Sequence, residues 1–153
     1  MGGSEVSAEA PVPAPGLLLL DTHVLIWSSS NQPRLGQQTA KIINLASRQN
    51  RLAVSAITPW EIGLLDSNKR ITLHKEALAW IREVLAQPGL SLIPLEPEIA
   101  IASSRLPFDM HPDPADRILV ATARHLGATL VTADANLLKL AKKGHFLAAD
   151  AQK

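Results

Sequence analysis

The sequence predicts a three-layer α/β/α sandwich around a central parallel sheet of four to five strands. Short apolar segments alternate with amphipathic segments along the chain, which is typical of parallel strands joined by right-handed helical crossovers. The first strand is the run of four leucines at 17–20, which ends at Asp21. A continuous apolar run is expected where a strand is buried on both faces of a sheet. Helices are therefore expected on both sides of this strand.

The remaining elements follow from the same patterns. Further strands are expected at 52–55, 90–94 and 128–132, and the fifth, if it forms, is a short edge strand at 145–147. Apolar residues at helical spacing predict helices at 24–27, 35–50, 58–65, 74–87, 96–104, 113–126 and 137–141. Gly127 stands where a left-handed residue ends the helix at 113–126. No internal repeat is present.

The composition is that of a soluble globular chain. Of its 153 residues, 46% are hydrophobic and 19% are charged, and no apolar run approaches the roughly 18 to 20 residues of a membrane span. Residues 1–16 are rich in Ala, Pro, Gly and Ser and are expected to form a flexible tail, without the basic and apolar regions of a signal peptide. Residues 17–150 are expected to form one domain.

The cysteine content and the charge of the chain limit the chemistry and the partners that can be expected. The chain has no cysteine, which removes disulfides and thiolate chemistry and suits a reducing cytoplasm. Its net charge of +1 neither favours nor opposes a polyanionic partner. Aromatic residues are only 3% of the chain, so contacts to a nucleic acid would be made mainly to phosphates. Arg117 and Arg34 neighbour the expected crevice and are the predicted phosphate contacts.

Four acids lie close to strand ends or to the helix starts that follow them: Asp21, Glu61, Asp116 and Asp134. In open α/β sheets, ligands bind at the carboxyl edge of the strands, where these acids are expected to meet. The nearby helix N-termini are expected to keep the carboxylates ionised. Crowded carboxylates repel unless a cation lies among them, and oxygen ligands favour Mg²⁺ or Mn²⁺. Two such ions would support in-line hydrolysis of a phosphodiester.

Each acid also has a structural explanation. Thr58 and Glu61 match a capping box, and Asp113 and Asp116 have the same spacing with Asp113 as the cap. Asp21 and Asp134 could likewise be simple N-caps.

The histidines are weaker candidates than the acids. His125 is expected in the last turn of a helix, where it complements the helix dipole. His23 and His111 have no partner at metal-ligand spacing and are not assigned a catalytic role.

Four segments of the chain carry a further signal: LDTHVLIW at 20–27, SAITPWEI at 55–62, HPDPADRILVATA at 111–123 and LVTAD at 130–134. Together they closely resemble the PIN-domain family, and most of all its VapC-type toxins from bacterial toxin-antitoxin pairs. They occur in the expected order and extend the resemblance over about residues 17 to 147. One departure is Leu65, where many relatives carry a lysine.

The resemblance implies roles for particular residues. Asp21, Glu61 and Asp116 match the family's metal-binding acids, Asp134 matches a fourth position that is often acidic, and Thr132 matches the small polar residue beside it. The family implies a Mg²⁺- or Mn²⁺-dependent endoribonuclease that acts on single-stranded RNA. It also implies a homodimer and a cognate antitoxin that lies across the cleft.

The sequence is also compatible with two other functions. The first is phosphoryl transfer through a covalent aspartate on a similar sheet, as in haloacid-dehalogenase-like phosphatases or receiver domains. Asp21 lacks the second aspartate two residues on that such phosphatases use, and the acid pattern of a receiver is absent. The second is a catalytically silent PIN domain that only binds RNA or a protein.

Overall fold

The computed structural model describes residues 16–153 and contains a five-stranded sheet with the order β3-β2-β1-β4-β5. All neighbouring strands are parallel, as predicted. The strands are β1 (Leu18–Leu20), β2 (Leu52–Ser55), β3 (Leu90–Ile93), β4 (Thr129–Thr132) and β5 (Leu147–Asp150). The predicted tail at 1–16 lies, except for Gly16, outside the described residues.

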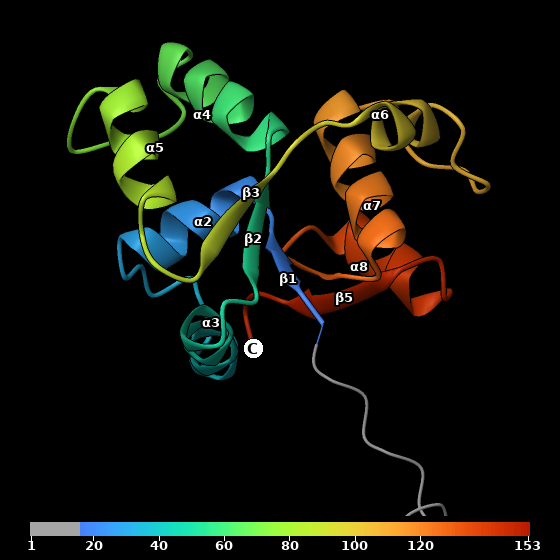
Figure 1. Ribbon diagram of the computed structural model, residues 1–153, viewed down its shortest axis with the longest axis horizontal. Helices are drawn as coiled ribbons and strands as arrows, with labels where there is room; N and C mark the ends of the chain where they lie inside the picture. The colour runs from blue at the N-terminus through green and yellow to red at the C-terminus, as the bar shows by residue number, and fades with distance from the viewer. Residues whose placement is uncertain (1–15) are drawn as a thin grey trace, which may run out of the picture.

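Helices cover both faces of this sheet (Figure 1). They are α2 (Thr22–Ser29), α3 (Gln37–Arg48), α4 (Ile57–Ser67), α5 (Ala77–Leu85), α6 (Pro97–Ser103), α7 (Pro114–Leu126) and α8 (Ala135–Lys142). Helices α2, α3 and α5 lie on one side of the sheet, and α7 and α8 lie on the other (Figure 1). The predicted three-layer fold is confirmed. None of the helices at 16–153 is long and apolar enough to cross a membrane.

Strand β1 is buried on both faces because its leucines alternate between two cores. Leu18 and Leu20 pack in the core beneath α2, α3 and α5, whereas Leu19 packs in the core beneath α7 and α8. Leu19 and Leu20 are fully buried. This alternation is the two-residue period of a strand. It fixes the direction and register of β1, and so fixes the place where Asp21 leaves the sheet.

The ends of several elements differ from the sequence-based prediction. The edge strand β5 begins at Leu147 and not at residue 145. Helix α5 begins at Ala77, three residues late, because the Glu76 side chain caps it by accepting hydrogen bonds from the amides of Leu78 and Ala79.

Two other boundaries agree with the prediction. Helix α7 ends at Gly127, whose φ of 61° is the predicted left-handed conformation. Strand β2 has the predicted bounds.

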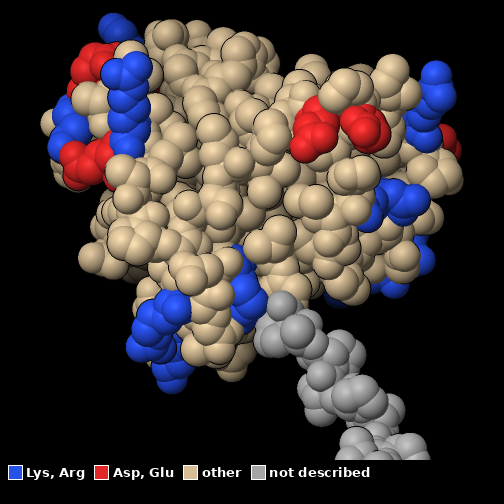
Figure 2. All heavy atoms as spheres, viewed as in Figure 1, with Lys and Arg blue, Asp and Glu red and all other residues tan. Residues whose placement is uncertain are grey.

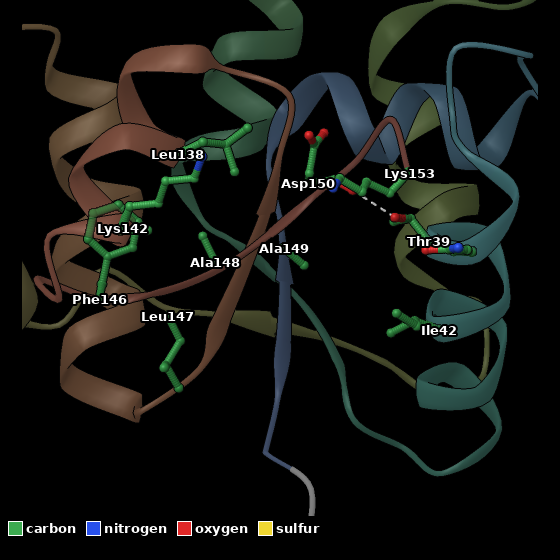
Figure 3. A pocket seen from close by; sticks show the side chains of 12 residues that line it. Thr39, Ile42, Leu138, Lys142, Phe146, Leu147, Ala148, Ala149, Asp150 and Lys153 are labelled. Carbon is green, nitrogen blue, oxygen red and sulfur yellow. Dashed lines mark hydrogen bonds between the residues drawn. The ribbon is translucent and has the colours of Figure 1, made fainter.

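The C-terminal strand is tied to the start of α3 (Figure 3). The Thr39 hydroxyl donates to the Asp150 carbonyl at 2.7 Å, and the Thr39 amide donates to the Lys153 carbonyl at 3.1 Å. A Cβ at Gly36 would stand 1.9 Å from that Lys153 carbonyl oxygen, so only glycine permits this approach. A groove of about 570 Å³ lies between α3, α8 and β5, and none of the four candidate acids lines it.

On the face shown in Figure 2, charged side chains form small groups of either sign, and two acidic groups lie inside the outline in its upper right part. The centre of this face is uncharged (Figure 2). This face therefore carries both basic and acidic groups.

Candidate active site

Asp21 is placed at the carboxyl edge of the sheet by β1 and held there by β4. Its amide donates to the Val131 carbonyl at 3.0 Å, and one carboxylate oxygen, Oδ2, accepts from the Thr132 hydroxyl at 2.7 Å. Although Asp21 occupies the N-cap position of α2, its carboxylate makes no cap bond within the described chain. The simple N-cap interpretation is therefore wrong for Asp21, and its carboxylate is available for other chemistry.

Thr132 and Asp134 extend the same cluster. The buried Thr132 hydroxyl also accepts a hydrogen bond from the Asp134 amide at 3.1 Å. Asp134 is a true N-cap, because its Oδ1 accepts from the amides of Asn136 and Leu137 at 2.8 and 3.0 Å. The cap does not use Oδ2. Asp134 can therefore cap α8 with one oxygen and serve the site with the other.

Glu61 is oriented by a residue that the sequence analysis did not single out, the fully buried Thr22. The Thr22 hydroxyl donates to Glu61 Oε1 at 2.5 Å and lies 3.2 Å from the Thr58 hydroxyl. Thr22 follows Asp21 directly, so α2 and α4 are joined at the edge where the acids meet. The only sequence signal for this role was the position of a threonine directly after the strand-end acid.

The capping box predicted for Thr58 and Glu61 is not formed. Helix α4 begins at Ile57, earlier than that motif requires, and Ala56 occupies its N-cap position. The Ser55 hydroxyl accepts from the Ile57 amide at 3.1 Å and so satisfies one free donor of the first turn. Glu61 therefore lies beyond the capping positions, and its carboxylate is not needed to start the helix.

Asp113 and Asp116 have different positions at the start of α7. Asp113 is the N-cap and its Oδ1 accepts from the Ala115 amide at 3.0 Å, as predicted. Asp116 lies in the first turn with a side chain that is 16% exposed, and its Oδ2 is 3.4 Å from His111 Nε2. His111 was not assigned a catalytic role from sequence, yet it is the side chain placed against Asp116.

The electrostatics of the cluster show that the acids crowd one another. Burial raises the pKa of Asp116 to about 7, and repulsion from the carboxylates of Asp21, Asp113, Asp134 and Glu61 adds to the rise. Burial also raises the pKa of Asp21 and of Glu61, although the threonine hydroxyls partly oppose it. Burial therefore opposes the expected effect of the helix N-termini at all three carboxylates, because desolvation disfavours the charged form and moves each pKa upward.

The basic candidates have distinct surroundings. Arg117 donates from Nε to the Ser103 carbonyl at 2.9 Å, and from Nη1 to the carbonyls of Met110 and His111 at 3.1 and 3.5 Å. The exposed Arg34 places its guanidinium carbon 5.9 Å from the centre of the Trp27 ring. Arg34 therefore stays a predicted phosphate contact, whereas most of the donors of Arg117 are already used.

The donor set fits a hard divalent cation. The described residues supply carboxylate and hydroxyl oxygens and no thiolate, which is the chemistry that Mg²⁺ and Mn²⁺ prefer. A cation would also offset the repulsion that raises the pKa of Asp116. Within residues 16–153, however, no three acidic or histidine side chains already converge closely enough to hold a metal ion.

The fold and the site together define a class: a three-layer α/β protein with carboxylates gathered at the carboxyl edge of a parallel sheet. The sequence pattern of the PIN domain matches residues 18–143, and the chain belongs to the PIN domain family. The resemblance recognised from sequence is confirmed. The alternative hypothesis of a phosphatase or receiver domain is therefore rejected.

Similar proteins agree with this assignment. The chain is 34% identical over 120 residues to Ribonuclease VapC22 from Mycobacterium tuberculosis, covering 78% of this chain and 88% of that protein. The structure of VapBC2 from Rickettsia felis bound to promoter DNA is 15% identical, with a TM-score of 0.62 over 88% of this chain and 98% of that one. DNA-bound VapBC from Salmonella typhimurium is 19% identical, with the same TM-score and coverage. The two structures support the fold.

Proposed function

We propose that this chain is a Mg²⁺- or Mn²⁺-dependent endoribonuclease that cleaves single-stranded RNA and is the toxin of a toxin-antitoxin pair. The observation that carries the proposal is the cluster of Asp21, Glu61, Asp116 and Asp134, in which burial and mutual repulsion raise the pKa of Asp116 to about 7. Such a cluster is costly unless it binds a cation. The relative named as a ribonuclease supports the RNA substrate.

We assign each residue of the site a separate role in metal binding, side-chain positioning or RNA contact. Asp21 and Asp116 would hold the ion, and Glu61 and Asp134 would complete the carboxylate set. Thr132 and Thr22 fix the rotamers of Asp21 and Glu61 through hydrogen bonds of 2.7 and 2.5 Å. The bound ion would activate water and neutralise charge on the phosphate. Arg34, which is exposed in the turn between α2 and α3, would contact an RNA phosphate.

The proposal includes partners and location. A further structure of similar fold is a toxin-antitoxin complex from Klebsiella pneumoniae, and we propose a cognate antitoxin that silences this chain by covering its acidic edge. A homodimer and a cytoplasmic location belong to the same proposal. A chain without cysteine is suited to that reducing compartment.

Purified protein is expected to cleave RNA with exposed single-stranded loops when Mg²⁺ or Mn²⁺ is supplied, and to stop when EDTA is added. The reason is that the carboxylates alone provide neither a charged nucleophile nor a counter-charge for the phosphate. The assay follows product bands with time at fixed ionic strength. Restored cleavage on adding back Mn²⁺ completes the test, and cleavage that persists in EDTA refutes the metal mechanism.

A catalytically silent PIN domain is the remaining alternative. The ordered hydrogen bonds to Asp21 and Glu61 favour activity, because they orient carboxylates that a binding module would not need. The same assay separates the two. A silent domain would bind RNA and leave it intact at every concentration of divalent ion.

A further inference from the structure

The loop at 104–113 joins α6 to α7 and carries two residues that lie beside Asp116. Asp113 caps α7, and His111 places Nε2 at 3.4 Å from Asp116 Oδ2. The position of this loop therefore decides which groups surround that carboxylate. Its path is irregular, so side chains must satisfy and hold its main-chain carbonyls.

Arg117 is the side chain that holds the part of the loop nearest the acids. Nε donates to the carbonyl of Ser103, the last residue of α6, which as a helix end lacks an intrahelical partner. Nη1 donates to the carbonyls of Met110 and His111. One planar guanidinium thus joins the end of α6, the loop and the first turns of α7.

A second anchor holds the loop farther from the acids. The Phe108 ring stacks on His145 with ring centres 4.1 Å apart, and the Arg124 guanidinium carbon is 5.3 Å from the centre of the Phe108 ring. Arg124 lies in the last turn of α7 and also donates to the His145 carbonyl. The two arginines therefore fasten the same loop to opposite ends of one helix, and only Arg117 does so at the acidic cluster.

We infer that Arg117 is a positioning residue, which sets His111 and Asp113 around Asp116 through the carbonyls of the loop and does not act chiefly as a phosphate contact. This inference rests on the proposed function for its link to catalysis. Three carbonyls in fixed directions require the planar fork of arginine, whereas a phosphate contact needs mainly a positive charge. Substitution by lysine separates the two roles, because lysine keeps the charge and loses the fork.

The test compares Arg117→Lys and Arg117→Gln with the wild type, and uses Arg124→Lys as the matched control on the same helix. Amide hydrogen exchange at 110–116 is measured without metal. The Mn²⁺-induced rise in Tm and the kcat and KM for a loop-containing RNA are then measured for each protein. The exchange measurement needs neither metal nor activity.

A positioning role predicts that both Arg117 variants behave alike. Exchange at 110–116 is expected to become about tenfold faster, since hydrogen bonds from a charged donor are lost. The Mn²⁺-induced Tm rise is expected to fall by about half, and kcat is expected to fall about tenfold with KM changed by less than about twofold. Arg124→Lys is expected to leave exchange at 110–116, the Mn²⁺ response and kcat at wild-type values.

A phosphate contact predicts a different pattern. Arg117→Lys would then match the wild type, while Arg117→Gln would raise KM and reduce the salt dependence of RNA binding by about one unit of slope. That result, or wild-type exchange in both variants, overturns the inference. If Arg117→Gln does not fold, Arg117→Lys alone decides between the two patterns. A wild type that does not cleave RNA refutes the proposed function, and the exchange data still decide the role of Arg117.

Discussion

Asp116→Asn is expected to raise the stability of the metal-free protein at pH 8 and to reduce RNA cleavage on the order of 1,000-fold. Burial and four neighbouring carboxylates raise the pKa of Asp116 from 3.8 to about 7. The ionised form is therefore unfavourable in the folded state, and a neutral amide of the same shape removes that cost. Cleavage falls because the same carboxylate is a proposed ion ligand, and several kcal/mol of charge stabilisation correspond to about this factor.

The pKa of Asp116 determines how the stability gained by Asp116→Asn depends on pH. A carboxyl group with a raised folded-state pKa binds more protons folded than unfolded, so its contribution to stability is complete below the unfolded pKa and is lost as pH rises to the folded pKa. For Asp116 this window runs from 3.8 to about 7. The gain in stability from Asp116→Asn should therefore be absent near pH 3.5, grow across the window and level off above it.

Denaturant unfolding in EDTA between pH 4 and pH 8 measures this difference, with Asp113→Ala as the control. Asp113 is an N-cap, so its replacement is expected to cost about 1 kcal/mol of stability and to leave activity partly intact. Added Mg²⁺ should reverse the order of Asp116→Asn and wild type, because a ligand bound only by the folded state stabilises that state. Equal stability of Asp116→Asn and wild type at pH 8 would contradict the electrostatic account.

Glu61→Gln is expected to remove most of the RNA cleavage and part of the Mg²⁺-induced rise in Tm without loss of stability in EDTA. The glutamine carbonyl oxygen can still accept from the Thr22 hydroxyl, which is 2.5 Å from the present carboxylate oxygen. Helix α4 starts without Glu61, so no cap is lost. The full charge is removed, however, and a neutral amide oxygen is a poorer ligand for a hard cation.

Glu76→Gln is the matched control for this substitution. The Glu76 carboxylate caps α5 by accepting hydrogen bonds from two backbone amides, and it is not one of the proposed metal ligands. Cleavage and the response to Mg²⁺ should therefore remain at wild-type values. Cleavage rates and thermal unfolding with and without Mg²⁺ are compared for the two variants. A fully active Glu61→Gln would leave the site to Asp21, Asp116 and Asp134.

The sheet was readable from sequence because each buried strand is a short apolar run bounded by turns or helix starts. Strand β1 and Asp21 were placed by four leucines and one acid, and α7 was bounded by Asp113 and Gly127. Strand β5 was predicted two residues too early because it lies at an edge and its sequence, LAAD, has no strong strand pattern. Its start was set by register with β4, which only the folded sheet provides.

The site was predicted as a set of acids but not as a set of contacts. The capping-box pattern at Thr58 was misleading because the Ser55 hydroxyl bonds the first turn of α4, so Thr58 is free to lie against Thr22. That contact joins residues 36 positions apart, beyond any local pattern. The raised pKa values likewise depend on burial and on neighbours from distant segments. Neither this contact nor the raised pKa values can be predicted from composition or from the spacing of motifs.

The central claim is that the four acids bind a divalent cation, and anomalous diffraction from crystals soaked in Mn²⁺ tests it most directly. The account predicts an anomalous peak at the carboxyl edge of the sheet, with carboxylate oxygens of Asp21 and Asp116 at about 2.0 to 2.2 Å. The same peak should be absent from crystals of Asp21→Asn. A peak only at other positions, or no peak in wild-type crystals at saturating Mn²⁺, would contradict the metal centre.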